Sequence, residues 1–134
     1  MAARSHVLLV HFPIALIVAA LLAEVLFMWR RSAGICATGR FCIVFAALSA
    51  LLTAFTGWSS GEAWSPARVD THRWLAVSAL ITSSLAALVS PLAARPVGWA
   101  RLAYRLLLVV AAVLVSLAAH QGGILVHGEG YLGL

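Results

Sequence analysis

Five histidines are the residues of this chain best suited to chemistry, and they fall at the ends of three apolar stretches. His6 and His11 lie at the start of the first stretch, His72 at the start of the third, and His120 and His127 at the end of the fourth. If these stretches cross a bilayer, all five histidines lie near the same membrane face. Imidazoles are costly in hydrocarbon and usually mark function there, so their convergence predicts a shared ligand.

The ligand that best fits neutral imidazoles on separate membrane helices is haem b. Six-coordinate iron takes two ligands on opposite sides, and the porphyrin needs an apolar slot. A zinc or copper site usually recruits Cys, Asp or Glu as well, and these are scarce at that depth. We therefore expect one or two haem b groups, with Arg73 and Arg4 near enough to the outer boundary to pair with haem propionates.

Depth along the spans favours a particular pair of ligands. At about 1.5 Å of rise per residue, His11 lies about 6 Å inside the outer end of its span and His120 about 9 Å inside the outer end of the fourth. His127 lies about 10 Å shallower than His120, so these two cannot ligate one iron. The candidate cofactor and metal ligands are His11, His72, His120 and His127, with His6 as a weaker fifth.

The elements that position these histidines are membrane helices. Hydrophobic residues make up 63% of the 134 residues and charged residues 10%, a balance that no water-soluble domain of this size can bury. Spans of about 20 residues are expected over about 7–29, 41–58, 72–89 and 102–126, within one domain, 1–134. Short connections make sequential helices antiparallel neighbours, so the expected fold class is an all-α, up-down four-helix membrane bundle.

Polar segments and helix breakers predict the connections. The basic stretch 30–40 is expected as the first loop, with Cys36 and Cys42 in or beside it as reduced, inert thiols. The second loop is expected over 59–71. The third span is expected to end where three helix breakers gather, at Pro91, Pro96 and Gly98.

The distribution of arginine predicts the orientation. The nine basic residues are all arginines, and they lie beside the spans rather than in a tail, which indicates membrane topology and not nucleic-acid binding. The connections after spans one and three hold six of them: Arg30, Arg31, Arg40, Arg95, Arg101 and Arg105. The positive-inside rule therefore places both termini on the outer, periplasmic side of a bacterial inner membrane.

Glu24 is the one acidic residue well inside a span. A lone carboxylate in hydrocarbon is expected to be paired. Arg31 shares its helical face, and Arg101 and Arg105 at the inner start of span four lie at a similar depth. We expect a structural ion pair with one or more of these arginines.

Both ends of the chain carry motifs of a known family. The segment 6–16, His-Val-Leu-Leu-Val-His-Phe-Pro-Ile-Ala-Leu, resembles the H-x-x-x-V-H-F-P-I-A-L opening of the DUF2231 family of small bacterial four-span membrane proteins. The segment 122–128, Gly-Gly-Ile-Leu-Val-His-Gly, resembles the family's G-G-x-L-V-x-x-H-G close, shortened by a residue or two. The resemblance implies His11, His72 and His127 as the ligand set; it does not include His120.

The function expected from these features is electron transfer. A membrane cytochrome b-like subunit would exchange electrons with a c-type cytochrome or a larger respiratory or photosynthetic complex, and would contact other membrane subunits and lipid. We expect no catalytic activity beyond this transfer. The alternative is a cofactor-free structural subunit of a membrane assembly, in which the histidines form hydrogen bonds to backbone, lipid or partner chains.

Overall fold

The computed structural model describes residues 2–58, 66–95 and 98–128, and within them the chain is helical apart from short turns. The helices are α1 (Ala2–Leu9), α2 (His11–Arg30), α3 (Ala33–Trp58), α4 (Pro66–Ala93) and α5 (Gly98–His127). Four segments are long and apolar enough to cross a membrane: Ser5–Arg30, Ala33–Trp58, Val69–Ala93 and Gly98–His127. The predictions of an all-α fold and a multi-pass membrane protein are confirmed.

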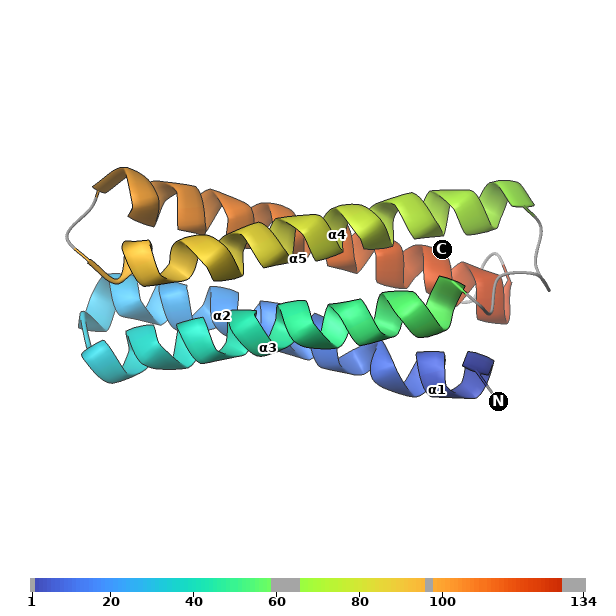
Figure 1. Ribbon diagram of the computed structural model, residues 1–134, viewed down its shortest axis with the longest axis horizontal. Helices are drawn as coiled ribbons and strands as arrows, with labels where there is room; N and C mark the ends of the chain where they lie inside the picture. The colour runs from blue at the N-terminus through green and yellow to red at the C-terminus, as the bar shows by residue number, and fades with distance from the viewer. Residues whose placement is uncertain (1, 59–65, 96–97, 129–134) are drawn as a thin grey trace.

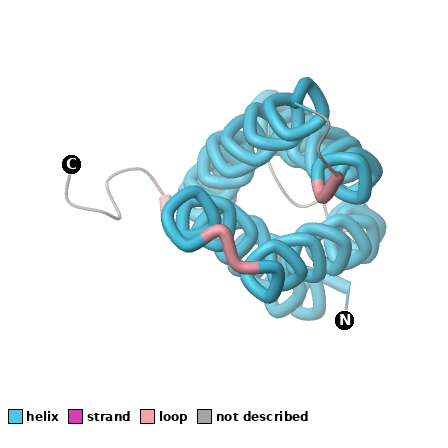
Figure 2. Tube along the Cα trace, turned by 90° about the vertical axis from the view of Figure 1, so that its left-hand side faces the viewer, coloured by secondary structure: helices cyan, strands magenta, loops and turns pink. Residues whose placement is uncertain are grey.

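The four long helices form an up-down bundle (Figure 1). Each packs against its neighbours in the chain, and α2 also packs against α5, which closes the ring seen along the bundle axis in Figure 2. One end of the bundle holds His6, His72 and His127, and is called the histidine end below. The other holds the turns after α2 and α4, with Arg30 and Arg95, and is called the arginine end. The assignment of the histidine end to the outer side stays a prediction.

The first span is divided into α1 and α2 by Pro13. Proline has no N–H to donate to the carbonyl of residue i−4, here Leu9, and its ring crowds that carbonyl. The helix is interrupted at Val10, one residue further on, where the backbone N–H of Val10 still bonds to the His6 carbonyl at 3.0 Å. As a result α1 is a separate short helix that packs against both α2 and α3.

The first connection is much shorter than expected. The predicted loop 30–40 is wrong, because α3 begins at Ala33 and carries Cys36, half-buried, and Cys42, buried, as free thiols. Arg31 ends α2 in the left-handed conformation, with φ of 49°, and its N–H bonds to the Phe27 carbonyl at 3.0 Å. This cap reverses the chain within two residues, so no longer loop is needed.

Pro91 does not end the third span as predicted, because α4 continues through it to Ala93. The missing N–H of Pro91 would have bonded to the carbonyl of Ala87. The Ser90 hydroxyl donates to that carbonyl instead, at 2.8 Å. Serine and threonine side chains often replace lost backbone bonds in this way inside membrane helices, which explains why the proline is tolerated.

Glu24 joins α2 to α5 near the arginine end. Its side chain is 6% exposed; its Oε1 lies 2.9 Å from Arg105 Nε, and its Oε2 lies 3.3 Å from an Arg101 Nη. The predicted ion pair is thus confirmed for two of the three candidate arginines. The third, Arg31, is exposed in the turn. The pair links two antiparallel helices through a carboxylate that is almost fully buried.

Small side chains set the distance between α4 and α5. Ala79, Ala86 and Ala93 recur at seven-residue spacing along the buried face of α4. Opposite them, α5 buries Leu108 and Ala111 among others. A seven-residue repeat of small residues lets membrane helices approach closely along a left-handed crossing. Ala79 also lines the cavity described below, so this helix pair forms part of its wall.

Candidate functional site

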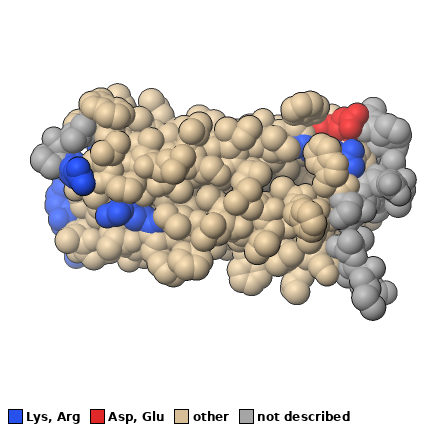
Figure 3. Space-filling model, in the orientation of Figure 1, with Lys and Arg blue, Asp and Glu red and all other residues tan. Residues whose placement is uncertain are grey.

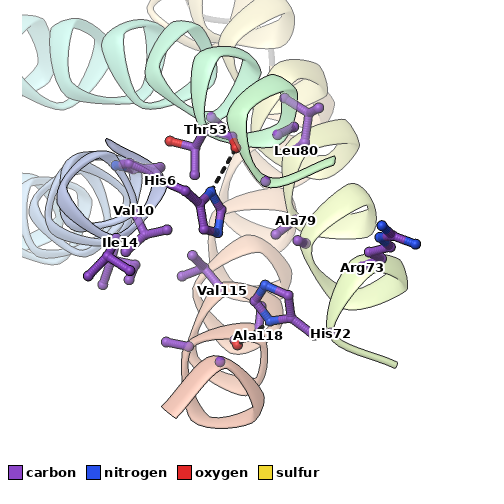
Figure 4. Close-up of a pocket in the computed structure, with 18 of the residues that line it drawn as sticks. His6, Val10, Ile14, Thr53, His72, Arg73, Ala79, Leu80, Val115 and Ala118 are labelled. Carbon is purple, nitrogen blue, oxygen red and sulfur yellow. Dashed lines mark hydrogen bonds between the residues drawn. The ribbon is translucent and has the colours of Figure 1, made fainter. Parts of the chain in front are cut away.

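A partly enclosed cavity of about 440 Å³ lies at the histidine end (Figure 4). Residues from all five helices line it, and four of the five histidines are among them: His6, His11, His72 and His127. The remainder of the lining is mainly alanine, glycine, valine and isoleucine or leucine. This is the combination expected of a cofactor site: an apolar slot with a few polar groups that converge on it.

His6 enters this cavity from α1 and is half-buried. Its Nδ1 lies 3.0 Å from the backbone carbonyl of Thr53 on α3. A carbonyl oxygen only accepts hydrogen bonds, so this Nδ1 carries the ring proton and donates it. In the neutral ring the Nε2 atom then holds a lone pair and is available to a ligand or a metal.

His72 has the same arrangement on the opposite side. It lies on α4, is half-buried, and its Nδ1 lies 2.9 Å from the backbone carbonyl of Ala118 on α5. By the same reasoning Nδ1 donates and Nε2 is left with its lone pair. The two imidazoles are therefore fixed in the same tautomer by two different helices.

The two rings lie close to one another in the cavity, nearly at right angles. Their centroids are 6.4 Å apart and their planes are nearly perpendicular, at 87°. In Figure 4 the second nitrogen of each ring is turned toward the space between His6 and His72. Two imidazole lone pairs from separate helices thus converge on one volume.

Glycines make room for both imidazoles. A Cβ at Gly57 on α3 would lie 2.6 Å from His6 Cε1 and 2.9 Å from its Nδ1, closer than real Cβ contacts. A Cβ at Gly122 on α5 would lie 3.3 Å from His72 Cε1. The imidazole of His6 consequently occupies the space that the Cβ of any other residue at position 57 would need. A Cβ at position 122 would instead make only a tight contact with His72.

This geometry makes Gly57→Ala a sensitive test of the site. We expect the added methyl group to displace His6 and to break its bond to Thr53, because the overlap cannot be relieved by a few tenths of an ångström. The affinity for haem, the cofactor expected from the sequence, should fall about tenfold or more, the range seen when a group that orients a metal ligand is lost. The measurement is a titration of the purified protein with haem, followed by absorbance.

The matched control is Gly34→Ala in the same helix. A Cβ there would meet only Ser32 Oγ, at the ordinary distance of 3.7 Å. Equal affinities of the two variants would contradict the role assigned to Gly57.

The other predicted ligands are placed differently. His11 and His127 are exposed at the edge of the cavity, and His11 Nδ1 bonds within its own helix, to the Val7 carbonyl at 2.9 Å. His120 is exposed and does not line the cavity. It follows buried Ala118 by two residues, about 200° around the helix, so it points out of the bundle. The structure brings together His6 and His72 rather than His11 and His120.

Arg73 lines the cavity beside Trp58, as expected of a group near the boundary. One Nη donates to the Trp58 carbonyl at 3.3 Å, the other lies 3.9 Å from Asp70 Oδ1, and the guanidinium lies 5.0 Å from the Trp58 ring centroid. Its Nε is buried and has no hydrogen-bond partner in the part of the chain that the structure describes. This leaves one buried donor that an acidic ligand group could satisfy.

Within the described residues, no three His, Cys, Asp or Glu side chains are grouped closely enough to hold a metal ion by themselves. Of the predicted ligands His11, His72, His120 and His127, all but His120 line the cavity, and their role in binding a cofactor stays a prediction. The two converging imidazoles suit a metal whose other ligands come from a cofactor.

Three comparisons with known proteins, against family models, curated proteins and solved structures, found no match. The likeness of segments 6–16 and 122–128 to one family therefore stays a hypothesis.

Proposed function

We propose that the protein binds haem b through His6 and His72 and acts as a membrane cytochrome b-like electron-transfer subunit. The observation that carries this proposal is a pair of half-buried imidazoles whose ring centroids are 6.4 Å apart. Each donates a hydrogen bond from Nδ1 to a backbone carbonyl, His6 to α3 and His72 to α5. Histidines that ligate metals commonly donate their other ring N–H to such a group, which fixes the ring and raises its basicity.

The separation of the rings agrees with a shared metal. An imidazole nitrogen binds a metal at about 2 Å, and the ring centroid lies about 1 Å further away, so two imidazoles on opposite sides of one ion have centroids about 6 Å apart. The observed separation is 6.4 Å. Two imidazoles in a tetrahedral site would be closer together.

The rest of the cavity suits the periphery of a porphyrin. Its lining is mostly apolar, and Arg73 offers for a propionate an Nε that has no hydrogen-bond partner among the described residues. Haem would supply a reversible one-electron couple. The protein would supply the two imidazole ligands, exclude water with the apolar walls, and hold the carboxylate with Arg73.

The partners follow from this role. We propose exchange of electrons with a c-type cytochrome or a larger complex in the bacterial inner membrane, and lateral contact with other membrane subunits and lipid. The exposed side chains along the helices are largely apolar, including Phe45, Leu52 and Val113. Such a surface fits lipid or neighbouring membrane helices.

A cofactor-free structural role is the second candidate, and one observation favours it. The bonds from His6 to Thr53 and from His72 to Ala118 each join two helices, and hydrogen bonds of this kind stabilise membrane bundles by about 1 kcal/mol. Histidines retained only for these bonds would need no metal.

A haem titration separates the two candidates. The purified protein is mixed with haem in detergent, and the absorption spectrum is recorded oxidised and dithionite-reduced. Saturable appearance of a Soret band and of reduced-state bands supports haem binding. Absence of these bands in folded protein, judged by circular dichroism, would refute it, and metal analysis of the same sample would show whether zinc or copper is held instead.

A further inference from the structure

A second candidate site lies at the arginine end, on the surface where α2 turns into α3. A shallow recess there is lined by Leu26, Arg30, Ser32 and Ile35. Arg30 and Ser32 are exposed, Leu26 is 48% exposed and Ile35 is half-buried. The recess thus combines a guanidinium and a hydroxyl with two aliphatic side chains.

The charge around this recess is positive and uncompensated among the described residues. Arg30, Arg31 and Arg95 are exposed at this end, and blue side chains gather there on the face shown in Figure 3. The structure describes two acidic residues. Asp70 lies at the opposite end, and Glu24 is buried between Arg101 and Arg105.

The position of the recess matches the headgroup layer of a bilayer. Trp29, next to Arg30, is 79% exposed, and tryptophan is enriched at membrane interfaces. The recess is at the end of a span whose exposed residues are largely apolar, and Leu26 lies one helical turn further into that span than Arg30. In a bilayer we therefore expect Leu26 to lie nearer the hydrocarbon and Arg30 nearer the headgroups.

The basic residues are suited to phosphate. All nine are arginine, whose planar guanidinium binds phosphate oxygens in a bidentate manner. Arg31 also holds the left-handed conformation that glycine usually occupies at a helix end, with φ of 49°. The turn therefore places a second positive charge, that of Arg31, beside Arg30. The backbone conformation at this position is one that arginine rarely adopts.

We infer that this recess binds the headgroup phosphate of an anionic phospholipid. Arg30 and Ser32 donate hydrogen bonds to the phosphate oxygens, and Leu26 and Ile35 contact the adjoining acyl chain. The inference concerns the opposite end of the bundle from the cavity and does not depend on haem.

The test compares Arg30→Gln with Arg95→Gln. Each variant loses one exposed positive charge at the same end, but only Arg30 lines the recess. Native mass spectrometry of the full chain, titrated with phosphatidylglycerol or phosphatidylcholine, gives the apparent affinity of each lipid. We expect Arg30→Gln to weaken phosphatidylglycerol binding about fivefold or more, as expected for one cation at the membrane surface. Arg95→Gln should bind like the wild type. Phosphatidylcholine should bind weakly to all three proteins, because its choline cation neutralises the phosphate and is repelled by the arginines.

Three results would overturn the inference. Equal weakening by both substitutions would show a diffuse electrostatic attraction without a site. Equal binding of phosphatidylcholine would show that charge is not recognised. Displacement of phosphatidylglycerol by millimolar inorganic phosphate would assign the recess to free phosphate. The control is the unfolding temperature of each protein in phosphatidylcholine alone. We expect the same temperature for both variants and the wild type, so that the affinities compared are those of folded proteins.

Discussion

We expect His6→Asn and His72→Asn each to lower the affinity for haem, the proposed cofactor, by about 100-fold, at least the loss seen when groups that merely support a metal ligand are removed. The reason is that asparagine keeps an amide donor near the position of Nδ1, which can still bond to the Thr53 or Ala118 carbonyl, but has no atom at the position of Nε2. The variants consequently remove the ligand atom while retaining the link between helices. A haem titration of each purified variant gives the change in affinity.

His120→Asn is the matched control, because His120 is exposed and lies outside the cavity. It should bind haem as the wild type does. Loss of haem binding in this variant, with normal binding in His6→Asn, would instead support the pairing predicted from depth, His11 with His120. Unchanged binding in all three variants would show that none of these imidazoles ligates the iron.

Glu24→Ala is expected to destabilise the protein by about 3–5 kcal/mol, the usual cost of removing one partner from a buried ion pair. The substitution leaves the guanidiniums of Arg101 and Arg105 without their shared carboxylate, and Arg101 cannot withdraw freely because it stacks on Phe27 at 4.4 Å. The change in free energy of unfolding can be measured by denaturant titration in mixed micelles, followed by circular dichroism.

An exposed pair at the other end supplies the control. Asp70 is 62% exposed and lies 3.9 Å from Arg73, so Asp70→Ala should cost no more than about 1 kcal/mol. The triple variant with leucine at 24, 101 and 105 should recover much of the loss, since an apolar replacement leaves no unpaired charge. A loss below about 1 kcal/mol for Glu24→Ala would show that water or lipid headgroups screen the pair.

The number and order of the membrane helices could be predicted because the bilayer fixes both the length and the polarity of a span. The ends of the helices could not. Arg40 and Pro91 were taken as parts of connections, yet both lie in helices. An arginine can reach toward the interface from inside a helix, and the Ser90 hydroxyl replaces the bond that Pro91 lacks, so neither residue type ends a membrane helix by itself.

The histidine-rich end and the partners of Glu24 could likewise be predicted from depth. The pairing of histidines required the rotational position of each helix, which depth does not give. On α5 the buried positions 104, 108, 111, 115 and 118 define the inward face, and His120 lies away from it. His6 was undervalued because the first span was expected to begin at about Val7, whereas α1 already includes His6 and packs on α3.

The most direct test of the central claim is the electron paramagnetic resonance spectrum of the haem-loaded ferric protein. Ligation by His6 and His72 predicts a low-spin signal, with the strong anisotropy expected of two imidazoles whose planes are nearly perpendicular, as they are in the structure at 87°. It also predicts that this signal is replaced by a high-spin signal in His6→Asn or His72→Asn. A high-spin spectrum of the wild type, or a low-spin spectrum that survives both substitutions, would contradict it.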